Sequence, residues 1–297
     1  MFLRPAVRTA ILFAFLLILG GSVICAGAYI SSGFDMTCFS TVKPETFLIA
    51  EDEPFRDIEV ELELGSLNLQ KALDGKAKVV CRATLHHSVS VTVEDGVLKI
   101  REIDQERTGH HWYNILYIDL SRENYGVTIF LPEEEYRSIT ASTRSGRLML
   151  SKHFAFDTVT LRSESGTLRL NATVHGTAQM LSDSGRLLLS GVEPENLIAR
   201  TSSGSVRFYR AIVRDTLDIQ TGSGGITLTE CDAGNTVLTT DSGWIYATFL
   251  TDKSYDIGTE SGYIQAPAGT TGAPCRAQTK SGGIYMSTFD RRRLGRW

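Results

Sequence analysis

The amino-acid sequence predicts an all-β fold, a single-stack β-solenoid with two strands in each rung of about 19–20 residues, preceded by an N-terminal transmembrane helix. Three observations predict this fold: an uncharged stretch over residues 9–30, a Ser-Gly dipeptide that recurs at a nearly constant interval, and apolar residues that alternate on both sides of each Ser-Gly. The composition agrees, because 27 glycines against 7 prolines in 297 residues are typical of many tight turns between strands.

Residues 9–30 predict the membrane segment. They carry no charge, and a helix of this length, at ~1.5 Å per residue, crosses the hydrocarbon core of a bilayer. Arg4 and Arg8 precede the segment and mainly acidic residues follow it, so we expect residues 1–8 in the cytoplasm and the rest outside, on a single-pass cell-membrane protein. The alternative is a signal peptide cleaved near Ala26-Gly27-Ala28, which would make the protein secreted.

The next two intervals lead into the repeat. Residues 31–54 are expected to be a linker, and residues 55–138 an irregular β region that covers the exposed edge of the first regular rung. Residues 56–70 alternate around Gly65-Ser66, and Asp95-Gly96 predicts a hairpin turn. Further short strands are expected over residues 79–81, 89–93, 97–100 and 127–131, and a loop over residues 101–113.

The regular solenoid is predicted over residues 139–288. Positions three and five after each serine are apolar, and positions four and six before it are mainly apolar, so each flanking strand buries one face. All eight residues two before the serine are Ser or Thr, which we expect to bond backbone groups at the corner or the same residue one rung away. We expect glycine at the corner for its backbone freedom. The corners are Ser145 and Gly146, Ser165 and Gly166, Ser184 and Gly185, Ser203 and Gly204, Ser223 and Gly224, Ser242 and Gly243, Ser261 and Gly262, and Ser281 and Gly282.

Outward residues of the strand after each corner suggest a binding surface. Positions two and four after the serine hold arginine in the first four rungs and aromatic residues in the last three. Exposed aromatic side chains about one strand spacing apart could grip a sugar ring or another protein. Alternatively, they stabilise the sheet by cross-strand packing. The arginines are Arg147, Arg169, Arg186 and Arg207, and the candidate partner-binding residues are Trp244, Tyr246, Tyr263 and Tyr285.

Other chemistry is weakly indicated. The net charge of −4 argues against a nucleic-acid ligand. The adjacent His110 and His111 would point to opposite faces of a strand, so we predict no metal site. No cofactor and no catalytic residue are predicted either. Rungs without insertions offer no wall for a catalytic cleft, and the protein is not expected to be an enzyme. The basic tail, residues 289–297, could touch anionic lipid or wall polymer, or be a solvated cap.

Four cysteines lie outside the membrane segment, with wide spacing and no CxxC motif. They are Cys38, Cys81, Cys231 and Cys275. We expect free buried thiols, although the even number leaves disulfides open.

Several motifs together resemble the bacterial putative-adhesin family, a domain of unknown function on envelope proteins. These motifs are the anchor, the opening Gly65–Leu69, the step Thr128–Pro132 and the T/S-x-S-G repeats, and the resemblance covers roughly residues 55–288. The resemblance implies a cell-surface setting with adhesion or envelope-stress signalling, and no catalytic residues. Residues 101–126 and the basic tail depart from the family's pattern, so the resemblance implies no particular partner.

The predicted function is a non-catalytic, membrane-anchored cell-surface module for adhesion or for sensing the state of the envelope. Its expected partners are the membrane and a cell-surface glycan, a wall polymer or an envelope protein. Two alternatives stay open: a structural scaffold within an envelope protein complex, and a carbohydrate-active β-helix enzyme.

Overall fold

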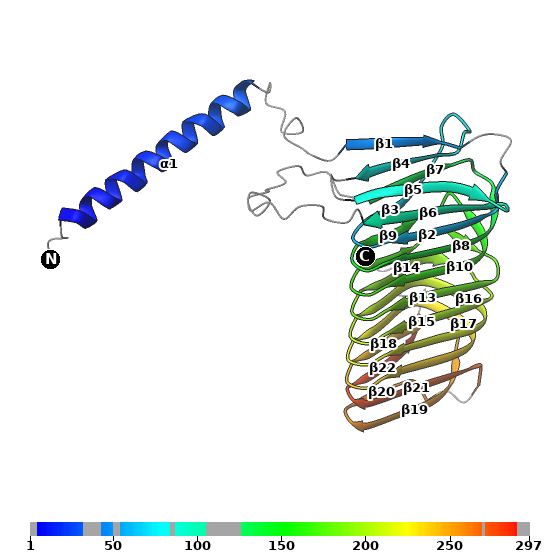
Figure 1. Ribbon diagram of the computed structural model, residues 1–297. Coiled ribbons are helices and arrows are strands. Elements are labelled where there is room, and N and C mark those ends of the chain that lie inside the picture. Colours follow the sequence, from blue (N-terminus) through cyan, green and yellow to red (C-terminus); the bar gives the residue numbers. More distant parts are fainter. Residues whose placement is uncertain are drawn as a thin grey trace, which may run out of the picture. The chain divides into compact units, whose positions relative to one another are not determined.

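Each repeat of the sequence forms one rung of an all-β solenoid in the computed structural model, which confirms the solenoid part of the predicted fold (Figure 1). The structure describes residues 5–31, 43–49, 54–83, 87–104, 126–268 and 271–289. The chain divides into two units, of which one contains the helix and the other contains the solenoid.

Helix α1 spans Pro5–Ser31 and contains the uncharged stretch. Within the part of the chain that the structure describes, no helix combines the length and the apolar character needed to cross a membrane. The transmembrane role of residues 9–30 therefore stays a prediction.

The strands follow the repeat closely. The region before the repeat contains β1 (Lys43–Leu48), β2 (Asp57–Leu62), β3 (Ser66–Lys71), β4 (Lys78–Ala83), β5 (His87–Glu94), β6 (Val97–Asp104) and β7 (Gly126–Leu131). The repeat begins with β8 (Glu135–Thr143), β9 (Arg147–Leu150), β10 (Ala155–Ser163), β11 (Thr167–Leu170), β12 (Thr173–Val174), β13 (Thr177–Ser182), β14 (Leu187–Val192) and β15 (Asn196–Thr201). It continues with β16 (Val206–Thr221), β17 (Ile226–Thr240), β18 (Ile245–Phe249), β19 (Lys253–Ser261), β20 (Ile264–Gln265), β21 (Ala273–Ser281) and β22 (Ile284–Thr288). Strand β1 falls inside the interval expected to be a linker.

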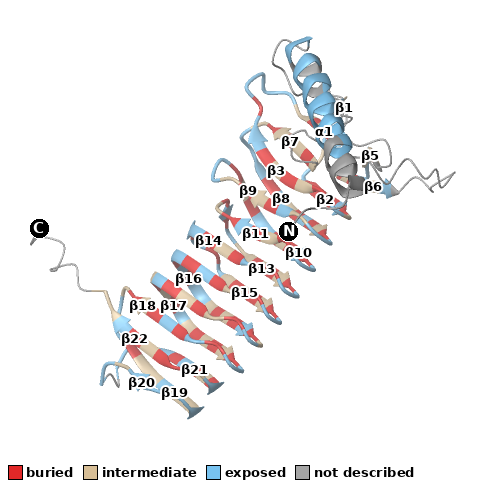
Figure 2. Cartoon of the chain, turned by 90° about the vertical axis from the view of Figure 1, so that its left-hand side faces the viewer, coloured by how far each residue is buried: buried red, intermediate tan, exposed pale blue. Residues whose placement is uncertain are grey.

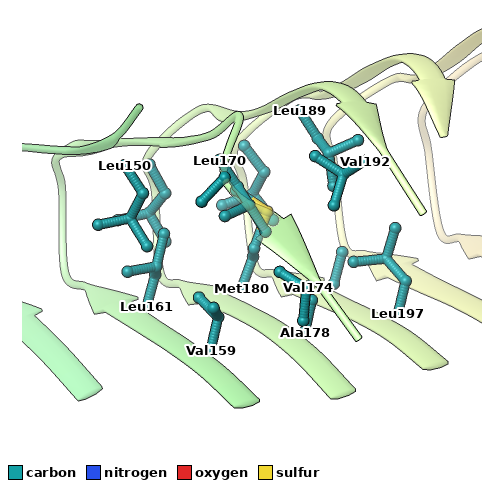
Figure 3. Close-up of a cluster of buried hydrophobic side chains, with 14 of the residues drawn as sticks. Leu150, Val159, Leu161, Leu170, Val174, Ala178, Met180, Leu189, Val192 and Leu197 are labelled. Atoms are coloured by element: carbon teal, nitrogen blue, oxygen red, sulfur yellow. The ribbon is translucent and has the colours of Figure 1, made fainter. Parts of the chain in front are cut away.

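Two sheets of mainly parallel strands enclose the core. Sheet A contains the strands that follow the Ser-Gly corners, and sheet B contains those that precede them. The long strands β16 and β17 run through both sheets, with a register shift between Val213 and Thr216. Buried and outward positions alternate along both sheets (Figure 2). Leu150, Leu170 and Leu189 of sheet A face Leu161 and Met180 of sheet B across the core (Figure 3).

Hydroxyl side chains bind the backbone at each corner. The amide of Gly204 donates to Thr201 Oγ1 at 3.0 Å, and the amide of Gly224 donates to Thr221 Oγ1 at the same distance. Thr221 Oγ1 in turn donates to the Gly204 carbonyl of the neighbouring rung at 3.3 Å. The first of the two roles expected for these residues is therefore the one observed, because their partners are corner backbone groups rather than each other.

The reason for glycine at the corners differs from the one expected. None of the eight corner glycines has a positive φ. Instead, a Cβ at Gly204 would overlap the carbonyl oxygen of Gly185, and a Cβ at Gly224 would overlap that of Gly204. The corners stack so closely that only glycine fits, so steric space rather than conformational freedom fixes the residue type.

The order of the rungs in space differs from their order in the chain at both ends. At the C-terminal end, β17 and β18 pair with β21 and β22, and β19 and β20 lie beyond these as the last rung (Figure 1). At the N-terminal end, β2 and β3 lie between β6 and β7 on one side and β8 and β9 on the other. Strands β2 and β3 thus form a regular rung that covers the edge of the first Ser-Gly rung, β8 and β9.

The outermost strands differ in direction of pairing between the two ends of the solenoid. At the N-terminal end, β4 and β5 add antiparallel to β7 and β6, and β1 pairs with β4. The predicted turn at Asp95-Gly96 joins β5 to β6, with both residues at positive φ. At the other end, β19 and β20 each have a partner on one side only among the described strands. Within the described residues, antiparallel pairing is therefore found at the N-terminal end, whereas the C-terminal end finishes on the parallel strands β19 and β20.

The described cysteines outside α1 are free and buried, as expected. They are Cys81, Cys231 and Cys275, whereas Cys38 lies outside the described residues. Burial raises the pKa of Cys81 and Cys275 to about 12 and that of Cys231 to about 11.

Candidate binding surface

Four aromatic side chains lie together on the outward face of sheet A near its C-terminal end. We call Trp244, Tyr246, Tyr263 and Tyr285 the aromatic ladder. The rings of Tyr246 and Tyr285 stack with centroids 4.8 Å apart and planes within 7°. Trp244 stacks on both, with centroids 6.1 Å from Tyr246 and 5.7 Å from Tyr285. Tyr263 lies 6.0 Å from Tyr285 at a tilt of 41°. The structure therefore brings all four predicted residues into one cluster.

The unusual order of the last rungs decides how the ladder is arranged. Tyr246 of β18 lies in register with Tyr285 of β22. Strand β20, which Tyr263 precedes, pairs on the far side of β22. Tyr285 therefore lies in the middle of the ladder, although it comes last in the sequence.

Gly283 makes room for the indole ring of Trp244. A Cβ at Gly283 would lie 2.5 Å from Cζ3 of Trp244 and 2.9 Å from Cε2 of Tyr285. The indole thus covers the glycine that directly precedes the neighbouring strand β22, and an aromatic ring over a glycine is a known way of stabilising a sheet. Sequence reasoning missed Gly283. A glycine at an outward position, two residues before an outward tyrosine, was the available signal.

Much of the ladder's surface faces solvent. The exposed fraction is 49% for Trp244, 45% for Tyr246 and 62% for Tyr263, whereas Tyr285 is half-buried. Stacked aromatic pairs contribute about 0.5–1.5 kcal/mol each beyond their buried area, so part of the ladder's role is to stabilise the sheet. The exposed aromatic surface is also suited to a flat apolar partner, such as the face of a sugar ring.

The four arginines lie on the same face of sheet A, towards its N-terminal end. Arg147, Arg169, Arg186 and Arg207 are all exposed. The face therefore changes from basic to aromatic along the solenoid, as the sequence predicts.

A groove that sequence reasoning missed runs along the Ser-Gly corners on the side of sheet B. It has a volume of about 900 Å³, and its lining includes Arg144, Arg162, Glu164, Asp183 and Arg200. Its sides are rows of side chains one and three residues before each serine, so it needs no inserted loop. Arg144 bonds Glu63 at 2.8 Å and lies 3.6 Å from Glu164, so part of its charge is already paired.

Metal-binding chemistry finds no support in the described ranges. Within them, no three His, Cys, Asp or Glu side chains come together in a group that could hold a metal ion. His110 and His111 lie outside the described residues.

Comparisons with known proteins address the fold. The family model described as Toastrack DUF4097 matches residues 55–295. No curated protein matches the chain. A solved structure from Parabacteroides distasonis, named "putative lipid binding protein", is 17% identical with a TM-score of 0.50, and the match covers 84% of this chain and 97% of that one. A "putative adhesin" from the same species is 13% identical with a TM-score of 0.48, with the same coverage. The likeness to the first of these structures shows a shared fold.

Proposed function

The chain belongs to the Toastrack DUF4097 family, and from that premise we propose that it is a non-catalytic binding module, displayed outside the cell on an N-terminal membrane anchor. The uncharged residues 9–30, with Arg4 and Arg8 before them, support the anchor and its orientation. The solenoid is then the extracytoplasmic part, in which rigid rungs hold a binding surface outward.

The aromatic ladder is the observation that carries the proposal. Exposed clusters of large apolar side chains on soluble domains usually mark interaction sites. Here Trp244, Tyr246 and Tyr263 remain 45–62% exposed on a rigid sheet, so little side-chain entropy is lost when a partner binds. We propose that the ladder receives the sugar rings of a cell-surface or wall polymer, in adhesion or in sensing the state of the envelope.

A second candidate function is a scaffold within an envelope protein complex. The observation that favours it is the open C-terminal end, where β19 and β20 each have one partner among the described strands. Unpaired strand edges are templates for strand addition by another chain. A scaffold would bind through this edge and would not need the exposed rings of the ladder.

The test is a binding screen of the full-length chain in phosphatidylcholine nanodiscs against whole cells, isolated wall polymers and a glycan array. A Trp244→Ser/Tyr263→Ser variant is compared with wild type. Loss of two aromatic contacts is expected to weaken binding about tenfold or more, since ~1.4 kcal/mol corresponds to a factor of ten.

Tyr209→Ser is the matched control. Tyr209 is 40% exposed on β16 of the same sheet and stacks with the Arg210 guanidinium rather than with the ladder. Binding that weakens in the ladder variant and persists in the Tyr209 variant supports the proposal. Equal binding by all three proteins would refute it, and binding only to envelope proteins would favour the scaffold.

A further inference from the structure

The arginines of sheet A extend the candidate surface beyond the aromatic ladder. We propose that Arg147, Arg169, Arg186 and Arg207, which we call the arginine grid, bind the charged groups of a linear anionic glycan that runs along the solenoid axis to the aromatic ladder. The inference rests on the proposed function and names its ligand class: a sugar polymer with repeating carboxylate, phosphate or sulfate groups.

The register of sheet A places the arginines in two columns. In the first column, Arg147 pairs with Thr167. Because the next residues, Leu168 and Leu187, also pair, Thr167 lies beside Arg186. In the second column, Arg169 pairs with Leu188, and Leu188 pairs with Arg207. Within each column, two arginines thus stand two rungs apart, which is about 9.6 Å at a strand spacing of ~4.8 Å. The columns alternate, so every rung from β9 to β16 presents one arginine.

The grid continues into the ladder at the same interval. Arg207 pairs with Thr227 of β17, and Thr227 pairs with Tyr246 of β18. Arg169, Arg207 and Tyr246 therefore stand in one column at steps of two rungs, about 9.6 Å each. An extended disaccharide unit has about this length, so a polymer with one charge per disaccharide would meet an arginine at each repeat and lay its next ring on the ladder.

The charges of the grid have no ion-pair partner in the part of the chain that the structure describes. Within the described residues, none of the four side chains makes an ion pair or a side-chain hydrogen bond, whereas Arg200 pairs with Asp218, Arg210 with Glu230 and Arg137 with Asp57. The positions two and four residues after the eight corner serines contain no Asp or Glu. A chain of net charge −4 thus keeps arginine and no acidic residue at these outward positions, which is the electrostatic pattern of a surface for anions.

The surface at the far end of the grid is hollowed. A groove of about 480 Å³ lies over β3, β7, β9 and β11, and its lining includes Arg82, Arg147, Asn68, Thr128 and Thr167. Hydroxyl and amide groups around a guanidinium suit the oxygens of a charged sugar. A polymer therefore has a recess at the basic end and an aromatic surface at the other.

The ladder favours a glycan over a bare anionic surface. A lipid headgroup layer or a polyphosphate would satisfy the arginines but offers no sugar ring to the aromatic side chains on the same face. We therefore commit to an anionic glycan, and the other polyanions serve as contrasting probes.

The test measures binding of the full-length chain, in phosphatidylcholine nanodiscs, to polygalacturonate and dextran sulfate. The contrasting probes are uncharged dextran, polyphosphate and vesicles of equal parts phosphatidylcholine and phosphatidylglycerol. For a flexible polyanion, the logarithm of the binding constant falls with the logarithm of the salt concentration, with a slope of about −0.7 for each charge contact. Four contacts therefore give roughly a 50-fold loss of affinity between about 50 and 200 mM salt. An Arg169→Gln/Arg207→Gln variant should keep two contacts and lose only about 7-fold over the same range.

The matched control is Arg56→Gln/Arg214→Gln, which removes the same charge from two exposed arginines elsewhere on the solenoid. Weaker glycan binding and a shallower salt slope in the grid variant alone support the inference. Equal effects of both variants, equal binding of neutral dextran, stronger binding of vesicles or polyphosphate, or no binding of an anionic glycan would each overturn it. If the ladder variant loses binding while the grid variant does not, the proposed function stands and this inference fails.

Discussion

The corner glycines offer the sharpest test of how the solenoid is held together. In Gly204→Ala, the new Cβ would overlap the Gly185 carbonyl oxygen and lie 2.7 Å from both the Gly185 carbonyl carbon and Thr201 Oγ1. Two of these atoms belong to the backbone of the neighbouring rung, so the overlap can be relieved only if the two corners move apart.

The size of the effect follows from two opposing contributions. Overpacking of a closely packed interior costs about 1–3 kcal/mol. Replacing glycine by alanine at an ordinary φ restricts the unfolded chain and returns about 0.4–1 kcal/mol. We therefore expect a net loss of about 1–2 kcal/mol, which lowers Tm by roughly 2–8 °C in a domain of this size.

Gly225→Ala is the matched control, because its Cβ would meet only the Trp244 carbonyl oxygen at 3.4 Å, an ordinary contact. Thermal and urea unfolding of both variants, followed by far-ultraviolet circular dichroism, measures the difference. Equal Tm values for the two variants would refute the claim that close stacking, rather than backbone conformation, selects glycine at the corners.

Three further predictions follow from buried groups. Thr221→Val leaves the Gly224 amide without its 3.0 Å acceptor and should cost about 1–3 kcal/mol in urea unfolding, whereas Thr221→Ser should cost much less; similar losses would contradict the hydrogen-bond assignment. Gly283→Ala should displace the Trp244 ring and reduce the near-ultraviolet circular dichroism of the ladder, and an unchanged spectrum would argue against the stacking. Burial raises the pKa of Cys275 from 9.0 to about 12, so the unfolded chain loses this proton at a lower pH than the folded chain. The free energy of unfolding should therefore fall as pH rises from about 9 towards 12, and Cys275→Ala should reduce this pH dependence.

The core could be predicted almost residue by residue, because the alternation of apolar positions states which face each strand buries. Leu148, Leu168 and Ile226 each lie three residues after a corner serine, and all are fully buried as expected. Ile264 occupies the same position in its rung, yet it is 40% exposed. Its rung is the last in space although it is not the last in the chain. The alternation therefore assigns Ile264 to the inward face correctly, but this rung has a neighbouring rung on one side only among the described strands.

The order of the rungs could not be predicted, because the repeat makes neighbouring rungs chemically equivalent. Ile245, Ile264 and Ile284 hold the same place in three successive repeats, and each fits beside either of the others. The aromatic cluster could be predicted because all its members are outward aromatics near one end. The order of the rings within the cluster, with Tyr285 in the middle, depends on the order of the rungs and therefore could not be predicted.

The exchange of the last two rungs has a consequence for biosynthesis. In a simple repeat protein, each new rung can dock on its predecessor as soon as it leaves the ribosome. Here residues 253–265 find their native neighbour only after β21 and β22 have been made and have paired with β17 and β18. The C-terminal end, including the aromatic ladder, can therefore be completed only when translation has passed residue 288. A truncated nascent chain would carry the earlier rungs without a finished aromatic ladder.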